Sequence, residues 1–197
     1  MSWRSAPGEY SGVSERGRTL PDVHLDLERD AAKSFPTLDD PESVTSARIW
    51  MCKYRSLAPV GTLCNLGVLE IADYPDETLD PVARLSNLEE LRILHLPKVS
   101  DLAPLSRLLS LRRLALETTP GWDASGKLTE VRSLDPVTRL PNLERLVLYG
   151  VVPPDRSVDS ILQSQSLREV RVSKYPREEV ERLLPKWYGP PPRGLSH

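Results

Sequence analysis

"LDPVTRLPNLERL", residues 134–146, is the last of three closely similar stretches of thirteen residues in this chain of 197. Residues 79–91 read LDPVARLSNLEEL, and residues 102–114 read LAPLSRLLSLRRL. The shared template is L-x-P-[VL]-x-x-L-x-x-L-x-x-L-x-[IL], and one more full copy begins at Leu57. A single copy cannot bury its apolar side alone, so we expect the copies to stack on one another.

Each copy changes its apolar period part-way along. The first part places an apolar residue at about every third position, as a helical or 3₁₀ segment does, and the end alternates as a strand does. A proline stands in the first turn of each full copy, where its missing N–H is tolerated. We expect Asp80 and Asp135 to cap these turns. We expect Asn65, Asn87 and Asn142 to end them in the left-handed conformation.

Two weaker copies, starting at Phe35 and Val158, extend the repeat in both directions, so that the six starts are 22, 22, 23, 32 and 24 residues apart. Together with SDLAPL (100–105), this pattern resembles the short-repeat type of the leucine-rich repeat family over residues 44–175. The resemblance implies an α/β fold, a curved right-handed solenoid. A parallel sheet of about six strands would form its concave side, and short helical or 3₁₀ segments its convex side.

The sequence departs from that family just after each expected strand. The usual Asn or Cys, which links neighbouring turns there, is absent, and the residues nearby are Tyr74, Leu96, Thr119 and Val151. We therefore expect an arc that is less regular than a horseshoe.

The chain divides into three parts in this interpretation. Residues 1–34 form an N-terminal flank and possible cap, residues 35–175 the repeat domain, and residues 176–197 a capping helix with a Pro-rich tail.

Within the N-terminal flank, residues 1–18 are expected to be disordered because of their Ser, Gly and Arg content. VHLDL (23–27) alternates like a strand, and ERDAAKSF (28–35) is expected to form one or two helical turns. At the other end, YPREEVERLLP (175–185) is expected to form the capping helix, with acidic residues in its first turn.

Side chains between the buried strand positions should line the concave face, because strand residues alternate between two faces. Acidic and basic residues alternate there from strand to strand, and such charges can neutralise one another. Apolar and aromatic side chains among them indicate a binding face, since aromatics and arginines are enriched as interface anchors. The residues that we expect to contact a partner are Arg48, Trp50, Glu70, Tyr74, Arg92, Leu94, Trp122, Arg145, Tyr149 and Arg171.

Six short strands would offer roughly 400 Å² in projection, against about 800 Å² per partner in a standard interface. A stable complex should therefore also use loops or caps. The long repeat carries PGWDASGK (120–127), with Trp122 near its tip. Trp122 would either fold back onto the solenoid or contact a ligand.

GWDASGKL (121–128) nearly matches the phosphate-binding loop G-x-x-x-x-G-K-[ST]. Leu128 stands at the hydroxyl position, and Asp123 would place a negative charge in the phosphate cradle. Neither a metal site nor an activated nucleophile is indicated by the spacing of His24, His95, His197, Cys52 and Cys64. We expect no cofactor, no metal and no catalytic residue.

The net charge of −2 and the pI near 6.0 do not favour nucleic acid as a partner. The N-terminus lacks the apolar segment of a secretion signal, and no apolar run is long enough to span a membrane. We expect a cytoplasmic, non-catalytic module, monomeric when free, that binds a protein partner through the concave face and the 120–127 loop. The sequence leaves open a nucleotide-dependent switch or enzyme, a self-associating solenoid, and an immunity-like or inhibitor-like protein.

Overall fold

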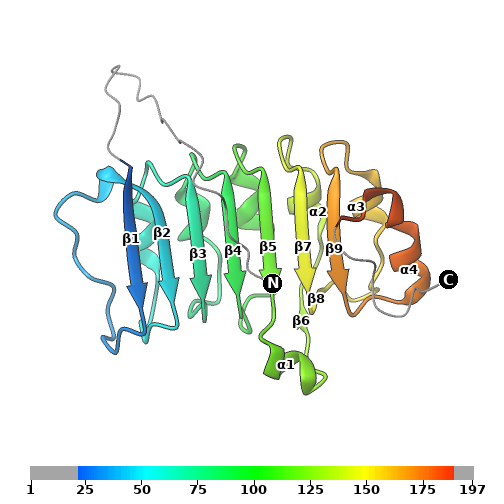
Figure 1. The fold of residues 1–197 in the computed structure, drawn as a ribbon, viewed down its shortest axis with the longest axis horizontal. Coiled ribbons are helices and arrows are strands. Elements are labelled where there is room, and N and C mark those ends of the chain that lie inside the picture. Colours follow the sequence, from blue (N-terminus) through cyan, green and yellow to red (C-terminus); the bar gives the residue numbers. More distant parts are fainter. Residues whose placement is uncertain (1–21, 189–197) are drawn as a thin grey trace.

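The main sheet is a single row of parallel strands that runs from one end of the molecule to the other (Figure 1). The computed structural model describes residues 22–188. In that range the sheet has seven strands, one more than expected, in the order β1-β2-β3-β4-β5-β7-β9. Their bounds are β1 Val23–Glu28, β2 Val44–Trp50, β3 Val68–Ala72, β4 Glu90–Leu94, β5 Arg113–Glu117, β7 Arg145–Tyr149 and β9 Glu169–Ser173.

Short helical segments cover the opposite side of this sheet (Figure 1). They connect successive strands and follow the helical part of each sequence copy. The segments are 3₁₀ turns at Pro41–Ser43, Ala58–Thr62, Val82–Arg84 and Ala103–Arg107, and the helices α2 Asp135–Thr138 and α3 Asp159–Gln163. The predicted α/β solenoid with a parallel sheet is confirmed.

In five of the six helical segments, a polar residue stands one place before the first apolar residue of the template. Its side chain accepts a hydrogen bond from the backbone N–H two residues later, at 2.8–3.4 Å, in Ser56, Thr78, Asp101, Ser133 and Ser157. The predicted capping by Asp80 and Asp135 is wrong, because these side chains lie past the start of the turn. Asp80 contacts Arg107 at 3.5 Å, and Asp135 contacts Arg139 at 2.8 Å.

The apolar template positions form one continuous core between the sheet and the helical segments. All 24 of these residues in the four full copies are buried, and none is more than 3% exposed. Burying one Leu or Ile side chain contributes about 1.5–3 kcal/mol. The stacked leucines therefore supply the main favourable free energy of folding.

The predicted left-handed conformation of the asparagines is wrong, because none of Asn65, Asn87 and Asn142 has a positive φ. Their side-chain amides donate instead to backbone carbonyls of the preceding turn, at 2.8–2.9 Å. These bonds link neighbouring turns at the corner before each strand. They take over the linking role that we expected to be missing after the strands.

Six left-handed residues lie at the opposite corner, directly after strands of the main sheet. Their φ values run from 52° to 70° at Arg29, Met51, Asp73, His95, Gly150 and Lys174. The backbone N–H of each of the first four donates to the last carbonyl of the next strand, at 2.7–3.2 Å. The sharp turn thus leaves no unsatisfied backbone donor at these four positions.

The long repeat adds structure that the sequence did not indicate. After β5 the chain forms helix α1 (Pro120–Ala124) and strand β6 (Thr129–Glu130). Strand β6 pairs in parallel with β8 (Val151–Val152) to make a second, two-stranded sheet. Helix α1 therefore lies beyond the carboxyl ends of the main strands (Figure 1).

At the N-terminal end the strand predicted at 23–27 is confirmed as β1, which pairs with β2. The helical turns predicted at 28–35 are wrong. Arg29 takes a left-handed conformation, and the Asp30 carboxylate accepts hydrogen bonds from the Ala32 N–H and the Tyr54 hydroxyl. These two bonds lower the pKa of Asp30 and hold the segment in an irregular path.

At the C-terminal end the predicted helix is confirmed as α4 (Arg177–Arg182). Val180 and Leu183 pack into the core, whereas Leu184 is 45% exposed. A 3₁₀ turn follows at Leu184–Lys186, and Trp187 then forms a parallel bridge with Val170 of β9. The segment thus covers part of the last strand's edge. The predicted disorder of residues 1–18 and the tail beyond 188 lie outside the described residues.

Candidate functional site

We call the side of the sheet opposite the helical segments the concave face. Three rows of side chains cross it, and their register agrees with the alternation predicted from the sequence. The first row is His24, Ser46, Val68, Glu90, Arg113, Arg145 and Glu169. The second is Asp26, Arg48, Glu70, Arg92, Ala115, Val147 and Arg171. The third is Glu28, Trp50, Ala72, Leu94, Glu117, Tyr149 and Ser173.

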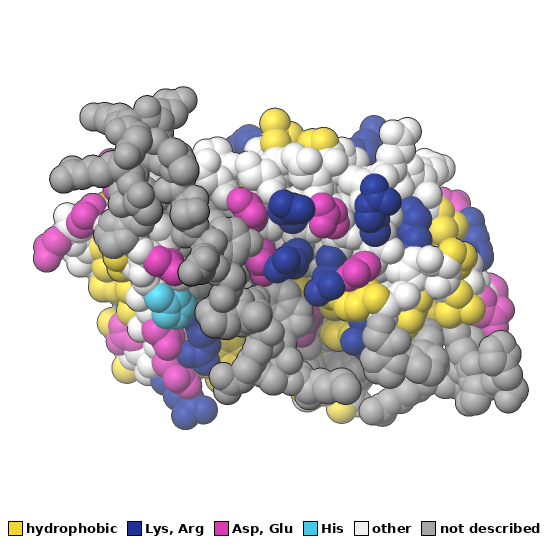
Figure 2. All heavy atoms as spheres, turned by 45° about the horizontal axis from the view of Figure 1, so that its top comes forward, with side chains coloured by type: hydrophobic (Ala, Val, Ile, Leu, Met, Phe, Trp, Pro, Cys, Tyr) yellow, Lys and Arg dark blue, Asp and Glu magenta, His cyan; other side chains and the backbone are white. Residues whose placement is uncertain are grey.

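Opposite charges meet across neighbouring strands on this face. Arg48 contacts Asp26 at 3.0 Å and Glu28 at 3.5 Å. Arg113 pairs with Glu90, and Arg145 pairs with Glu169. Acidic and basic side chains accordingly interleave on the visible surface and do not gather in patches of one sign (Figure 2).

Arg92 is the centre of this network. Its guanidinium lies 3.4 Å from Glu70 and 3.0 Å from Glu117, and its side chain is only 20% exposed. Burial opposes the charge of Arg92, but its hydrogen bonds to Glu117 and Glu70 and their charges outweigh burial and raise its pKa. Arg92 is therefore fixed by its neighbours in the free protein.

Aromatic side chains lie among these charges. Trp50 is half-buried, and the guanidinium carbons of Arg48 and Arg92 lie 4.7 and 5.9 Å from its ring centre. Leu94 and Tyr149 are also half-buried on the same row. The face therefore presents apolar surface, and the charges that flank Trp50 are already paired.

Tyr74 does not lie on the concave face, so its predicted exposure is wrong. The side chain is 2% exposed, and its hydroxyl donates to the Thr78 carbonyl at 2.7 Å. The physical reason is the left-handed turn at Asp73, which redirects the chain after β3 and points the next side chain into the core.

Trp122 folds back onto the solenoid. Its ring packs edge-on against His95, with ring centres 4.8 Å apart, and Lys127 Nζ lies 4.9 Å from the indole centre. The indole Nε1 and the His95 Nδ1 are buried, and neither has a hydrogen-bond partner among the described residues. Helix α1 thus holds a half-buried aromatic side chain beside the end of β4.

Sequence reasoning missed Tyr188, which follows the capping segment. Its ring centre lies 4.7 Å from the guanidinium carbon of Arg145 and 5.7 Å from that of Arg171. The C-terminal segment therefore contributes an aromatic side chain to the concave face. The adjacent aromatic pair in KWY (186–188) was the available signal.

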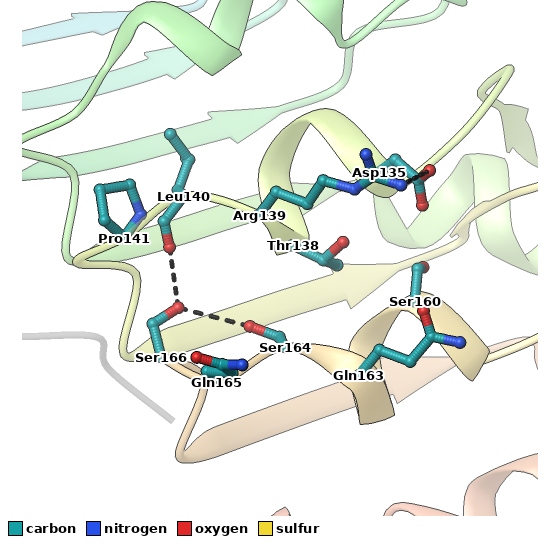
Figure 3. Close-up of a pocket in the computed structure, with 10 residues that line it drawn as sticks. All are labelled: Asp135, Thr138, Arg139, Leu140, Pro141, Ser160, Gln163, Ser164, Gln165 and Ser166. Atoms are coloured by element: carbon teal, nitrogen blue, oxygen red, sulfur yellow. Dashed lines mark hydrogen bonds and ion pairs between the residues drawn. The ribbon is translucent and has the colours of Figure 1, made fainter.

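The convex side carries a groove of about 620 Å³ between α2 and α3 (Figure 3). Its lining is polar, and the Ser166 hydroxyl donates to the Leu140 carbonyl at 2.8 Å. Its acidic and basic side chains, Asp135 and Arg139, pair with each other. An adjoining groove of about 290 Å³ includes Leu109, which is 59% exposed. Neither groove presents an unpaired charge or an aromatic side chain.

The residues that the structure describes carry neither a metal-binding cluster nor a membrane-spanning helix. No group of three His, Cys, Asp or Glu residues in the range 22–188 could hold a metal ion. None of the helices described is long and apolar enough to cross a bilayer. The segment that resembled a phosphate-binding loop folds as α1 and β6. A five-residue helix occupies the place where such a loop would wrap phosphates.

No protein-family model matches this sequence, and no curated protein does. Solved structures of similar fold include internalin C2 of Listeria monocytogenes (23% identity, TM-score 0.49, covering 67% of this chain and 53% of that one). They also include internalin F of the same organism (18%, 0.46, covering 77% and 47%). The leucine-rich repeat domain of the type III effector XopL is similar as well (18%, 0.49, covering 76% and 51%).

This chain spans about half the length of each of those structures. Its own features define its architecture: four full copies of one leucine template, a parallel strand from each copy, and a continuous leucine core. The chain has the fold of a leucine-rich repeat solenoid.

Proposed function

We propose that this chain is a non-catalytic recognition module that binds a protein partner on its concave face. The observation that carries the proposal is the group of half-buried side chains Trp50, Leu94 and Tyr149, which lie in one row among the charged residues of the face. Aromatic side chains with adjacent arginines are the residues that dominate interface energetics.

The paired charges around these anchors support the same function. Arg48 and Arg92 are held by carboxylates and stack on Trp50, so little side-chain entropy remains to be lost on binding. Because four of the five arginines in the three rows are paired with carboxylates, the face as a whole carries no large electrostatic field. Selectivity would then come from shape and from the exact positions of the charges.

The area of the sheet requires a contribution from outside it. Seven strands about 4.8 Å apart, each about 17 Å long, give roughly 490 Å². A stable partner buries about 800 Å² on each side. Helix α1 lies beyond the carboxyl ends of the main strands (Figure 1) and carries Trp122, and the C-terminal segment carries Tyr188. These two aromatic groups would extend the surface beyond the strands.

Affinity purification with the intact chain tests the proposal. The double variant Trp50→Ala/Tyr149→Ala should lose the partners that the wild type retains, with at least a tenfold loss of affinity for two anchors. Leu109→Ala is the matched control, because Leu109 is exposed on the convex side. Partners that bind the double variant as well as the wild type would contradict binding through the concave face.

The other readings rank below this one. The α1–β6 segment gives the nucleotide-switch alternative no phosphate cradle, and an inhibitor-like protein would be one form of the proposed binding module. The cytoplasmic location and the monomeric state stay predictions from the sequence.

A further inference from the structure

Arg171 of β9 lies between two tyrosine side chains on the concave face. Its guanidinium carbon is 5.6 Å from the ring centre of Tyr149 and 5.7 Å from that of Tyr188. Tyr149 comes from the neighbouring strand β7, and Tyr188 from the C-terminal segment. Elements far apart in the sequence thus converge on one cation.

Arg171 differs from the other arginines of this face in having no carboxylate partner. Arg48, Arg92, Arg113 and Arg145 each pair with at least one Asp or Glu. Within residues 22–188, no ion pair involves Arg171, and its buried Nε–H has no hydrogen-bond acceptor. A buried donor without an acceptor costs free energy, which an acceptor brought by a ligand would recover.

The two tyrosines determine how a ligand can approach. Rings that stack on a guanidinium leave its planar edge open, and that edge matches the two oxygens of a carboxylate. Burial raises the pKa of both the Tyr149 and the Tyr188 hydroxyl, so both stay protonated at neutral pH. Arg171 therefore lies in partly desolvated surroundings, in which the two tyrosine hydroxyls are hydrogen-bond donors.

Two carboxylates of these rows already have cationic partners. Glu169 is paired with Arg145, and Glu117 with Arg92. Arg171 is therefore the one arginine of the three rows that lacks a carboxylate partner within residues 22–188. One carboxylate from a partner would give it the charge-assisted pair that the other four arginines already have.

We propose that Arg171, Tyr149 and Tyr188 form a carboxylate-binding site that takes one Asp or Glu side chain of the protein partner. This proposal rests on the proposed function and adds the chemistry that the partner must present. It predicts an acidic side chain at a fixed position in segments that bind this end of the sheet.

Selection from a displayed library of random peptides on the intact chain supplies the probe. Wild-type binders should share an Asp or Glu at one position, and Arg171→Gln should bind them about tenfold more weakly or worse. Arg171→Lys should fall between the two, because it keeps the charge and loses the planar fork. Arg139→Gln, an exposed pair member on the convex side, is the control and should bind as the wild type does. Circular dichroism and thermal unfolding check that each variant is folded.

A double-mutant cycle assigns the contact. Replacing the shared acidic residue of a selected peptide by its amide should weaken binding to the wild type about tenfold and have little effect on Arg171→Gln. Binders that depend on Trp50 but share no acidic residue, or are unaffected by Arg171→Gln, would overturn the carboxylate site and leave the proposed function standing. Failure to select any binder that is sensitive to Trp50→Ala would overturn both.

Discussion

Gly150 lies at a corner where the backbone packs closely against Thr118 of the preceding turn, so that no side chain fits there. It has φ of 67°, and a Cβ placed there would lie 2.2 Å from Thr118 Oγ1. Gly150→Ala should therefore destabilise the fold by about 1–3 kcal/mol, through backbone strain and the steric clash. Denaturant unfolding measures this.

Gly121→Ala is the control for that substitution. A Cβ at Gly121 meets no atom within 4 Å, and the residue lies in helix α1. The Gly121→Ala substitution should leave the free energy of unfolding unchanged or raise it slightly. Equal destabilisation by the two variants would contradict the assigned role of the corner at Gly150.

Tyr74 makes the stability of the protein sensitive to alkaline pH. Burial raises the pKa of its hydroxyl above the ordinary value of 10.0, with the charges of Asp76 and Asp80 acting in the same direction. In the unfolded chain the Tyr74 hydroxyl ionises at a lower pH than in the folded protein. Its contribution to the free energy of unfolding is therefore complete below pH 10.0 and is lost as the pH rises above that value.

Tyr74→Phe removes both this pH dependence and the hydrogen bond to the Thr78 carbonyl. The variant should be about 1 kcal/mol less stable at neutral pH. Its free energy of unfolding should then fall less steeply than that of the wild type above pH 10.0. Parallel curves for the two proteins would contradict a raised pKa of the Tyr74 hydroxyl.

At the scale of the elements, the asparagine side chains join three of the turns to the turns before them. Asn87→Ala removes the bond from its amide to the Cys64 carbonyl, which is 2.9 Å long. The loss should cost about 0.5–1.5 kcal/mol. Ser110 stands at the same place in the copy that starts at Leu102, and its side chain makes no hydrogen bond within residues 22–188. Ser110→Ala should leave thermal unfolding nearly unchanged, and a comparable loss there would contradict this role of the asparagines.

Helix α4 lies at the C-terminal end of the main sheet, and Leu183 directly follows it. Leu183 is fully buried against the last repeat, and Leu183→Ala should cost about 2–5 kcal/mol. Because each repeat contacts mainly its neighbours, hydrogen exchange should rise in β9 far more than in β3. A uniform rise along the sheet would indicate that the solenoid unfolds only as a whole.

At the scale of the whole molecule, the sequence predicted the features that depend on the repeat. The leucines, the strand register and the three rows of the concave face follow from a fixed period, so each residue's direction could be assigned in advance. Features at places where the repeat period breaks could not be predicted from the sequence. Tyr74 follows a left-handed corner, and Tyr188 reaches the face from beyond the last copy.

The central claim is that a protein partner covers the concave face. Hydroxyl-radical footprinting of the intact chain, with and without its tightest binder, tests it most directly. Trp50, Leu94 and Tyr149 should become protected on binding, while the exposed Leu109 on the convex side keeps its reactivity. Protection of Leu109 with unchanged labelling of Trp50 and Tyr149 would contradict the account.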